Sequence, residues 1–133
     1  WFNATSQGPK NRGKNYFFGG TSTAATSARA TIGTQTIKLP AAGAGHKATL
    51  RGWLGNYNAD TAQVRAAFMD SSGKVLGAVR IGPDTTIGGS NMACRTRSGT
   101  VPKGAASVSV VVTFTDHANY NLAGADDLSL VLS

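Results

Sequence analysis

Residues 47–55 read KATLRGWLG, and apolar and polar side chains alternate along most of this stretch. Successive side chains of an extended strand point to opposite faces, so the alternation is typical of a β-strand with one buried and one outward face. The buried face is predicted to hold Ala48, Leu50, Gly52 and Leu54. The outward face is predicted to hold Lys47, Thr49, Arg51 and Trp53.

The same two-residue period recurs between clusters of turn-forming residues, and no 3.6-residue period runs long enough for a helix. The pattern predicts eight strands, over residues 15–19, 29–39, 47–55, 62–70, 74–81, 94–100, 106–115 and 127–132. Between two of them, Asp70-Ser71-Ser72-Gly73 predicts a hairpin turn, since glycine adopts a positive φ at little cost. Strands at this spacing indicate an all-β fold, an antiparallel β-sandwich.

The composition narrows the classes of function. The 133 residues correspond to a single domain, and no apolar run approaches the roughly 20 residues of a membrane span. A net charge of +7 favours polyanionic partners. All six acidic residues are Asp, which excludes mechanisms that need a Glu as acid or base, and we expect no catalysis. The single Cys94 excludes an internal disulfide and is expected to be buried.

The next predicted strand, residues 62–70, alternates in the same way and directs Arg65 outward. We therefore expect Trp53 and Arg65 to be neighbours on an open face, with Arg51 beside them. A flat indole stacks on the apolar C–H face of a sugar ring, and arginine donates hydrogen bonds to hydroxyls or carboxylates. This arrangement is typical of a sugar-binding face.

Two loops bear on this prediction. Trp53 has an alternative role as a packing residue at the rim, covered by the loop that carries Tyr57 or by Trp1 and Phe2. The polar loop of residues 116–124 offers hydrogen-bonding groups for sugar hydroxyls. The candidate ligand contacts are Arg51, Trp53, Tyr57, Arg65, His117, Asn119 and Tyr120.

Five short motifs follow one another along the chain: GKNYFFGG at 13–20, LRGWLG at 50–55, FMD at 68–70, IGP at 81–83 and DDLSL at 126–130. Together they resemble the galactose-binding-like jelly rolls of carbohydrate-binding modules, as found in secreted actinobacterial proteins. The resemblance covers nearly the whole chain. It implies a single jelly-roll domain over residues 1–133, a secreted protein and a glycan or cell-envelope polysaccharide as ligand.

In such modules an Asp of the closing strand helps to hold a structural calcium ion, with backbone carbonyls and an acidic residue from an opening strand. Asp126 and Asp127 match the closing strand, so the resemblance implies that they are metal ligands. The opening strand and its Glu do not appear here, and the pair supplies only part of the about six oxygen ligands of calcium. The alternative is an Asp pair that caps backbone donors. An unpaired sheet edge also favours a strand from a second polypeptide chain.

Nucleic acid is the main rival partner suggested by the charge. Lys10, Arg12 and Lys14 cluster near the start, and Arg95 and Arg97 alternate in one predicted strand. No nucleic-acid-binding motif accompanies them, so nucleic acid is disfavoured, and for a secreted protein an anionic polysaccharide is the favoured polyanion. We expect a non-catalytic carbohydrate-binding module. The alternative is a protein–protein interaction module or a processed subunit of a secreted enzyme or toxin assembly.

Overall fold

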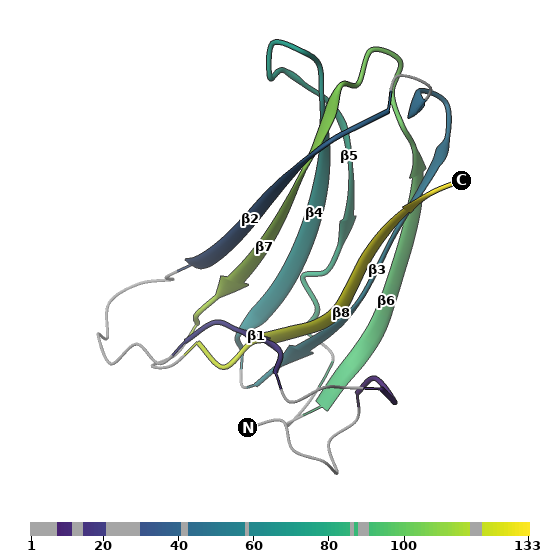
Figure 1. Ribbon diagram of the computed structural model, residues 1–133. Helices are drawn as coiled ribbons and strands as arrows, with labels where there is room; N and C mark the ends of the chain where they lie inside the picture. The colour runs from purple at the N-terminus through teal and green to yellow at the C-terminus, as the bar shows by residue number, and fades with distance from the viewer. Residues whose placement is uncertain are drawn as a thin grey trace.

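The computed structural model describes residues 8–11, 15–20, 30–40, 43–57, 59–85, 87, 91–117 and 121–133. The strands in this part of the chain are β1 (Phe17–Phe18), β2 (Ala30–Lys38), β3 (Lys47–Asn56), β4 (Thr61–Met69), β5 (Val75–Ile81), β6 (Asn91–Thr100), β7 (Ser107–Thr115) and β8 (Gly124–Leu132). They form two sheets that face each other, as Figure 1 shows. No helix among the described residues is long and apolar enough to cross a membrane.

The order of the strands identifies the topology. Sheet A has the order β1-β8-β3-β6 and sheet B the order β2-β7-β4-β5, with every pairing antiparallel. Among the described strands, only β4 and β5 are paired and also consecutive in sequence, so most connections cross from one sheet to the other. Two four-stranded sheets linked in this way form a jelly roll. The predicted fold class is confirmed.

The predicted strands agree with the structure to within one residue except at three starts. Strand β1 begins two residues after its predicted position and is only two residues long. Both β6 and β8 begin three residues before the predicted position. Residues 91–93 pair with the end of β3, and residues 124–126 pair with the same part of β3 from its other side. Neither start shows a run of alternating apolar and polar residues, so tertiary pairing extends the strands beyond their own sequence signal.

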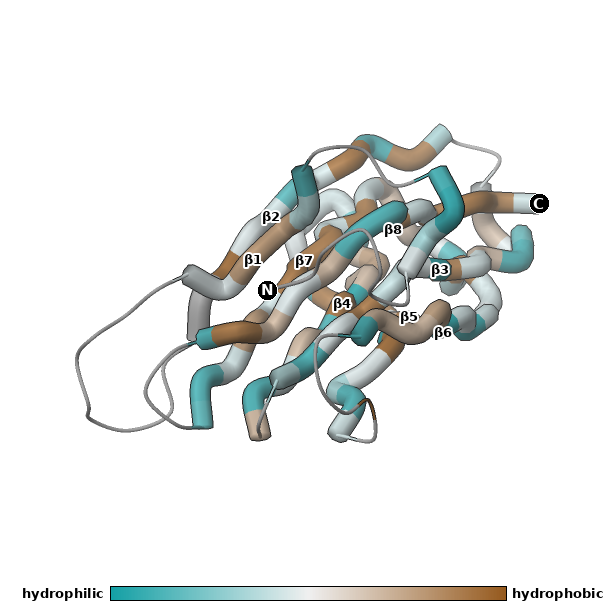
Figure 2. Tube along the Cα trace, turned by 90° about the horizontal axis from the view of Figure 1, so that it is seen from below, coloured by the Kyte–Doolittle hydropathy of each residue, from teal (hydrophilic) through white to brown (hydrophobic). Residues whose placement is uncertain are grey.

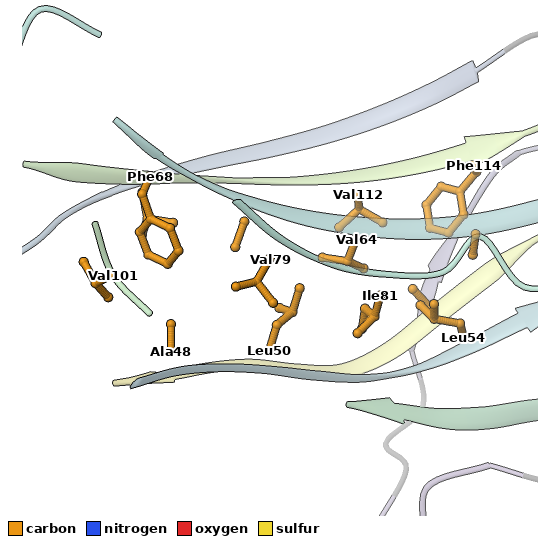
Figure 3. Close-up of a cluster of buried hydrophobic side chains, with 14 of the residues drawn as sticks. Ala48, Leu50, Leu54, Val64, Phe68, Val79, Ile81, Val101, Val112 and Phe114 are labelled. Carbon is orange, nitrogen blue, oxygen red and sulfur yellow. The ribbon is translucent and has the colours of Figure 1, made fainter. Parts of the chain in front are cut away.

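The core fills the space between the sheets. Figure 3 shows Phe68, Val64 and Val112 of sheet B directed toward Leu50 and other side chains of sheet A. The predicted buried face of β3 is confirmed, because Ala48, Leu50 and Leu54 are each at most 1% exposed. Figure 2 shows the same alternation as brown, apolar segments between paler and teal ones along the strands. Burial of the apolar face of each sheet is the main source of stability in such a fold.

A β-bulge interrupts β8 beside β3. Asp126 lies opposite Trp53 and Ser129 lies opposite Arg51, so two residues of β8 face the single Gly52 of β3. Asp127 takes up the extra residue with a φ of 49°, the positive φ of a left-handed conformation. Leu128 points inward and occupies the space that a Cβ atom of residue 52 would need. Glycine at 52 therefore lets the bulge pack against the centre of sheet A.

The predicted hairpin turn after β4 is confirmed. Gly73 has a φ of 85°, and its amide donates to the carbonyl of Asp70 at 3.1 Å. The Asp70 carboxylate accepts hydrogen bonds from the Ser72 hydroxyl at 2.7 Å, the Ser72 amide at 2.9 Å and the Lys74 amide at 3.0 Å. These bonds hold the ionised carboxylate in the turn.

This turn has an expected pH dependence. The hydrogen bond from the Ser72 hydroxyl, followed by that from the Lys74 amide, lowers the pKa of Asp70 below its usual value. A lowered folded-state pKa adds stability above the unfolded pKa, and this stability is lost as pH falls through the folded pKa. Wild type should therefore exceed Asp70→Asn in urea midpoint at about pH 6, with a gap that narrows toward about pH 2. A gap that stays constant over this range would contradict the assignment.

The side of the sandwich at β2 and β8 is open. Every residue from Ile32 to Lys38 is exposed, although β2 is hydrogen-bonded to β7. An apolar cleft of about 500 Å³ lies between β2, β7 and β8. Phe17 and Ile37 line it and are 59% and 41% exposed. Sheet B therefore presents part of its inward face to solvent on this side.

Candidate functional site

The outward face of sheet A brings Arg51 and Trp53 together, as the alternation in residues 47–55 predicts. Both lie on β3, between β8 and β6. The register places Cys94 of β6 opposite Trp53. We call this surface the Trp53 face, and its members are Thr49, Arg51, Trp53, Cys94, Thr96, Ser98, Asp126 and Asp127.

Trp53 lies half-buried in this face. Its Nε1 atom is buried and has no hydrogen-bond acceptor among the described residues. Because Nε1 is the only polar atom of the indole, the exposed part of the side chain is ring carbon. The backbone of β3 is covered, since the strand pairs with β6 and β8. Ring carbon is the part of an indole that stacks on a sugar. The residue thus has an inner edge that packs and an outer surface that a ligand can reach.

The neighbouring end of the Trp53 face is partly covered. The register places Met92 on the same side of sheet A, opposite Gly55, yet Met92 is only 4% exposed. Trp1 and Phe2, which the alternative reading of Trp53 invoked as a cover, lie outside the described residues. Tyr57, just beyond the end of β3, is 38% exposed. The role of Trp53 in ligand binding stays a prediction.

Arg51 is held by the bulge of β8. Its Nη1 atom donates to Oδ2 of Asp127 at 3.0 Å, and both side chains are exposed to solvent. This hydrogen bond is the main reason why the pKa of Arg51 is raised above its usual value, and the nearby Cys94 adds to it. Cys94 is half-buried rather than buried, because it lies on the outward side beside Trp53. The ion pair fixes a guanidinium group next to the indole.

The Asp pair predicted to bind calcium lies at the same bulge. Oδ1 of Asp126 accepts the backbone amide of Asp127 at 2.8 Å, and the carboxylate of Asp127 is paired with Arg51. Among the described residues no third acidic, histidine or cysteine side chain joins them. Two carboxylates, one of them opposed by a guanidinium group, do not form a calcium shell by themselves. The observed bonds match the alternative of a pair that caps a backbone donor, and bound calcium stays a prediction.

Asp60 organises the loop that leads into β8. It is fully buried, and its two carboxylate oxygens accept the amides of His117 and Leu122, each at 2.8 Å. His117 itself is exposed at the start of this loop. The other two predicted contacts of the loop, Asn119 and Tyr120, lie outside the described residues. Sequence reasoning missed Asp60, whose isolated position in a polar loop gives no sign of its burial.

The expectation that Arg65 neighbours Trp53 is wrong. Arg65 lies on β4 in sheet B, whereas Trp53 lies on β3 in sheet A. Each points to the outward face of its own sheet, so the two residues lie on opposite sides of the sandwich. The expectation treated consecutive strands as paired, but the connection between β3 and β4 crosses from one sheet to the other.

Arg65 instead belongs to a second surface, which we call the arginine groove. This groove has a volume of about 660 Å³ and lies along β5 and β6, the edge strands of the two sheets that approach each other. Its lining comprises Arg65, residues 78–84 and residues 95–99. Arg65, Arg80, Arg95 and Arg97 line it together with one acidic residue, Asp84, which leaves three positive charges in excess.

The register explains how the arginines converge. Arg65 and Arg80 are direct cross-strand partners on β4 and β5. Arg95 and Arg97 lie opposite Gly52 and Leu50, on the side of β6 that faces sheet B. Their side chains are about 7 Å apart along the strand, the spacing of alternate residues. The two edge strands approach each other closely at Gly99 and Val79, since a Cβ atom on residue 99 would lie 2.8 Å from the Val79 side chain.

One of the four arginines is already neutralised. Arg95 donates from Nε and Nη2 to Oδ2 of Asp84, and from Nη1 to the carbonyl of Cys94 at 3.2 Å. Asp84 is only 9% exposed, so this ion pair anchors residues 82–84 against β6. The excess charge of the groove therefore resides on Arg65, Arg80 and Arg97. Of these four arginines, only Arg65 was a predicted ligand contact, because nothing in the sequence shows which strand edges meet.

No family model matches the sequence, and no curated protein matches it. Among solved structures, the carbohydrate-binding module TmCBM61 in complex with β-1,4-galactotriose is similar, with a TM-score of 0.55 and 14% identity. The likeness covers 92% of this chain and 74% of that one. It concerns the fold, a β-sandwich like that of a carbohydrate-binding module.

A second solved structure is similar over a smaller part of its length. It is the enzymatically active domain of tailspike protein 4 from bacteriophage CBA120, with a TM-score of 0.56 and 18% identity. The match covers 78% of this chain but only 14% of the tailspike chain. The chain thus spans about a seventh of that protein, and the likeness again concerns the fold alone.

Proposed function

We propose that this protein is a non-catalytic carbohydrate-binding module that binds a glycan on the Trp53 face. The observation that carries the proposal is the half-exposed indole of Trp53 in the middle of a paired sheet, beside the Arg51–Asp127 ion pair. The ring offers apolar carbon for stacking, and Arg51 offers donors for sugar hydroxyls. The fold shared with TmCBM61, which was solved with a galactotriose, supports the proposal.

The rest of the face suits polyhydroxylated ligands. Thr49 and Ser98 are exposed cross-strand partners whose hydroxyl groups form a hydrogen bond at 3.0 Å. Thr96 lies between Ser98 and Cys94 on the same side of β6. Hydroxyl groups both donate and accept, so this row can exchange hydrogen bonds with sugar hydroxyls. Secretion, calcium and the actinobacterial setting remain expectations that follow from the sequence resemblance.

The proposal is tested by removing the ring. Trp53→Ala should abolish retention on polysaccharide-containing native gels, with β-1,4-galactan among the probes, because the stacking surface is lost. Trp53→Phe should keep part of the retention. Phe17→Ala is the matched control, since Phe17 is an exposed aromatic residue that lines the apolar cleft on the other side of sheet A. Unchanged retention of a folded Trp53→Ala protein would disprove this site.

A second candidate function is favoured by the apolar cleft beside β2. The exposed Phe17 and Ile37 lie next to an edge of β2 that pairs with no strand in the described part of the chain, and they suit an interaction module that takes an extended strand from another polypeptide. Light scattering over a concentration series tests whether a second copy supplies that strand. Association that Phe17→Lys removes would support this candidate. A monomer at every concentration that is still retained by polysaccharide would favour glycan binding.

A further inference from the structure

We infer that the arginine groove is a separate binding site for an acidic polysaccharide, a sugar chain that carries repeated carboxylate or sulfate groups. The inference goes beyond the Trp53 face, and it rests on the proposed function only in taking the ligand to be a glycan. Trp53 does not line the groove, and Arg65, Arg80 and Arg97 of the groove do not belong to the Trp53 face, so the two sites can be tested separately.

Charge is the first argument. Arg65, Arg80 and Arg97 line one groove in which the only carboxylate, that of Asp84, is already bound to Arg95. Guanidinium groups present a planar fork of donors that matches carboxylate and other oxyanion geometry. Converging arginines on low-dielectric walls also concentrate anions. An anionic ligand is therefore complementary to the groove.

The pairing of Arg65 with Arg80 is the second argument. The two guanidinium-bearing residues lie directly opposite each other on β4 and β5. Like charges at such positions destabilise a sheet. An anion bound between the two guanidinium groups would relieve their repulsion. Ligand binding therefore explains why this destabilising pair is present. A purely structural role for Arg80 offers no such explanation.

The lining favours a saccharide over nucleic acid as the polyanion. Four arginines line the groove, and none of the described residues in its lining is aromatic. Proteins that bind single-stranded nucleic acid combine a basic groove with aromatic side chains on which bases stack. This groove has only the basic half of that arrangement. It suits a sugar chain whose anionic groups are bound by arginine.

The test compares two double variants of equal charge. Arg80→Gln with Arg97→Gln removes two exposed cations from the groove, and Lys38→Gln with Lys74→Gln removes two exposed lysines elsewhere. The probes are dextran sulfate, unsubstituted dextran, polygalacturonate and a poly-dT oligonucleotide, measured by titration at about 150 mM salt. We expect the arginine variant to bind dextran sulfate or polygalacturonate at least tenfold more weakly than wild type, and the lysine variant to change by less than about threefold.

Each outcome decides the inference. Equal loss in the two double variants would show a general charge effect and overturn it, as would equal binding of dextran and dextran sulfate. Arginine-dependent binding that is tightest for poly-dT would replace the saccharide by nucleic acid. If the arginine variant loses binding to polygalacturonate alone, the groove binds carboxylate groups. If it loses binding to dextran sulfate alone, the groove binds sulfate groups. Binding of Trp53→Ala to neutral galactan tests the Trp53 face independently of the arginine groove, because a neutral polysaccharide carries no anionic group for the arginines.

Stability gives an independent readout. Arg80→Gln should unfold at the same or a higher temperature than wild type without ligand, because it removes the repulsion from Arg65. Acidic polysaccharide should raise the melting temperature of wild type but not of the groove variant, since a ligand stabilises the state that binds it. A lower melting temperature of Arg80→Gln without ligand would assign Arg80 a structural role and overturn the argument from repulsion.

Discussion

Replacing Phe68 by alanine is expected to lower the free energy of unfolding by about 4 kcal/mol. Phe68 is fully buried on β4, and it is the largest side chain that is fully buried between the two sheets. Figure 3 shows its ring near Val101 and Ala48 in the same layer of the core. The loss combines the apolar surface that is no longer buried with the cavity left where the sheets cannot close. Urea denaturation followed by tryptophan fluorescence measures the change.

Phe17→Ala is the matched control for this experiment. Phe17 is 59% exposed, so its removal should change the free energy of unfolding by no more than about 0.5 kcal/mol. A cost below about 1 kcal/mol for Phe68→Ala would contradict the burial of this ring. Similar costs for the two variants would show that Phe17 is covered in solution, which bears directly on the open cleft beside β2.

Asp60→Ala is expected to cost about 2–4 kcal/mol, because the amides of His117 and Leu122 lose the carboxylate that accepts both. Asp60 is fully buried, so water does not replace the lost acceptor without rearrangement of the loop. Asp60→Asn keeps one carbonyl oxygen and should cost about half as much. Thermal unfolding of both variants measures the difference. Equal stability of wild type and Asp60→Ala would show that the loop is held by other contacts.

The local pattern of this fold is readable from the sequence. Alternation in residues 47–55 identifies the buried Leu50 and Leu54, and the turn at Asp70 to Gly73 joins β4 to β5 as predicted. Both features depend on side-chain direction and on φ preferences, which act within a few residues. The positions of β2, β3, β4, β5 and β7, each correct to within one residue, follow from the same local rules.

The arrangement of the strands is not readable in this way. Counting outward from the turn would place Arg65 opposite Val79, but the extra residue Leu76 in β5 shifts it to face Arg80. Likewise, nothing within β3 or β4 indicates that they lie in different sheets, so the position of Arg65 relative to Trp53 was wrong. Sheet membership depends on long-range packing, which leaves no periodic signal in either strand.

Strand β6 takes part in both proposed sites. Cys94, Thr96 and Ser98 point to the outward side with the Trp53 face, while Arg95 and Arg97 point toward the arginine groove. Because alternate residues of one edge strand serve the two surfaces, single substitutions separate them cleanly. An extended polysaccharide that follows this edge would meet stacking and ionic contacts on the same strand.

The bulge at Asp127 determines where β8 can lose a residue without disturbing its pairing with β3. Elsewhere in this strand, loss of one residue would turn the side chains on one side of the deletion to the opposite face of the sheet. At the bulge the strand already carries one position beyond what β3 requires, so loss of Asp127 would leave an unbroken ladder with Leu128, Leu130 and Leu132 still inward. Natural variants of this domain should therefore tolerate a single-residue deletion here, which removes the ion pair with Arg51 and the hydrogen bond from the Asp127 amide to Asp126.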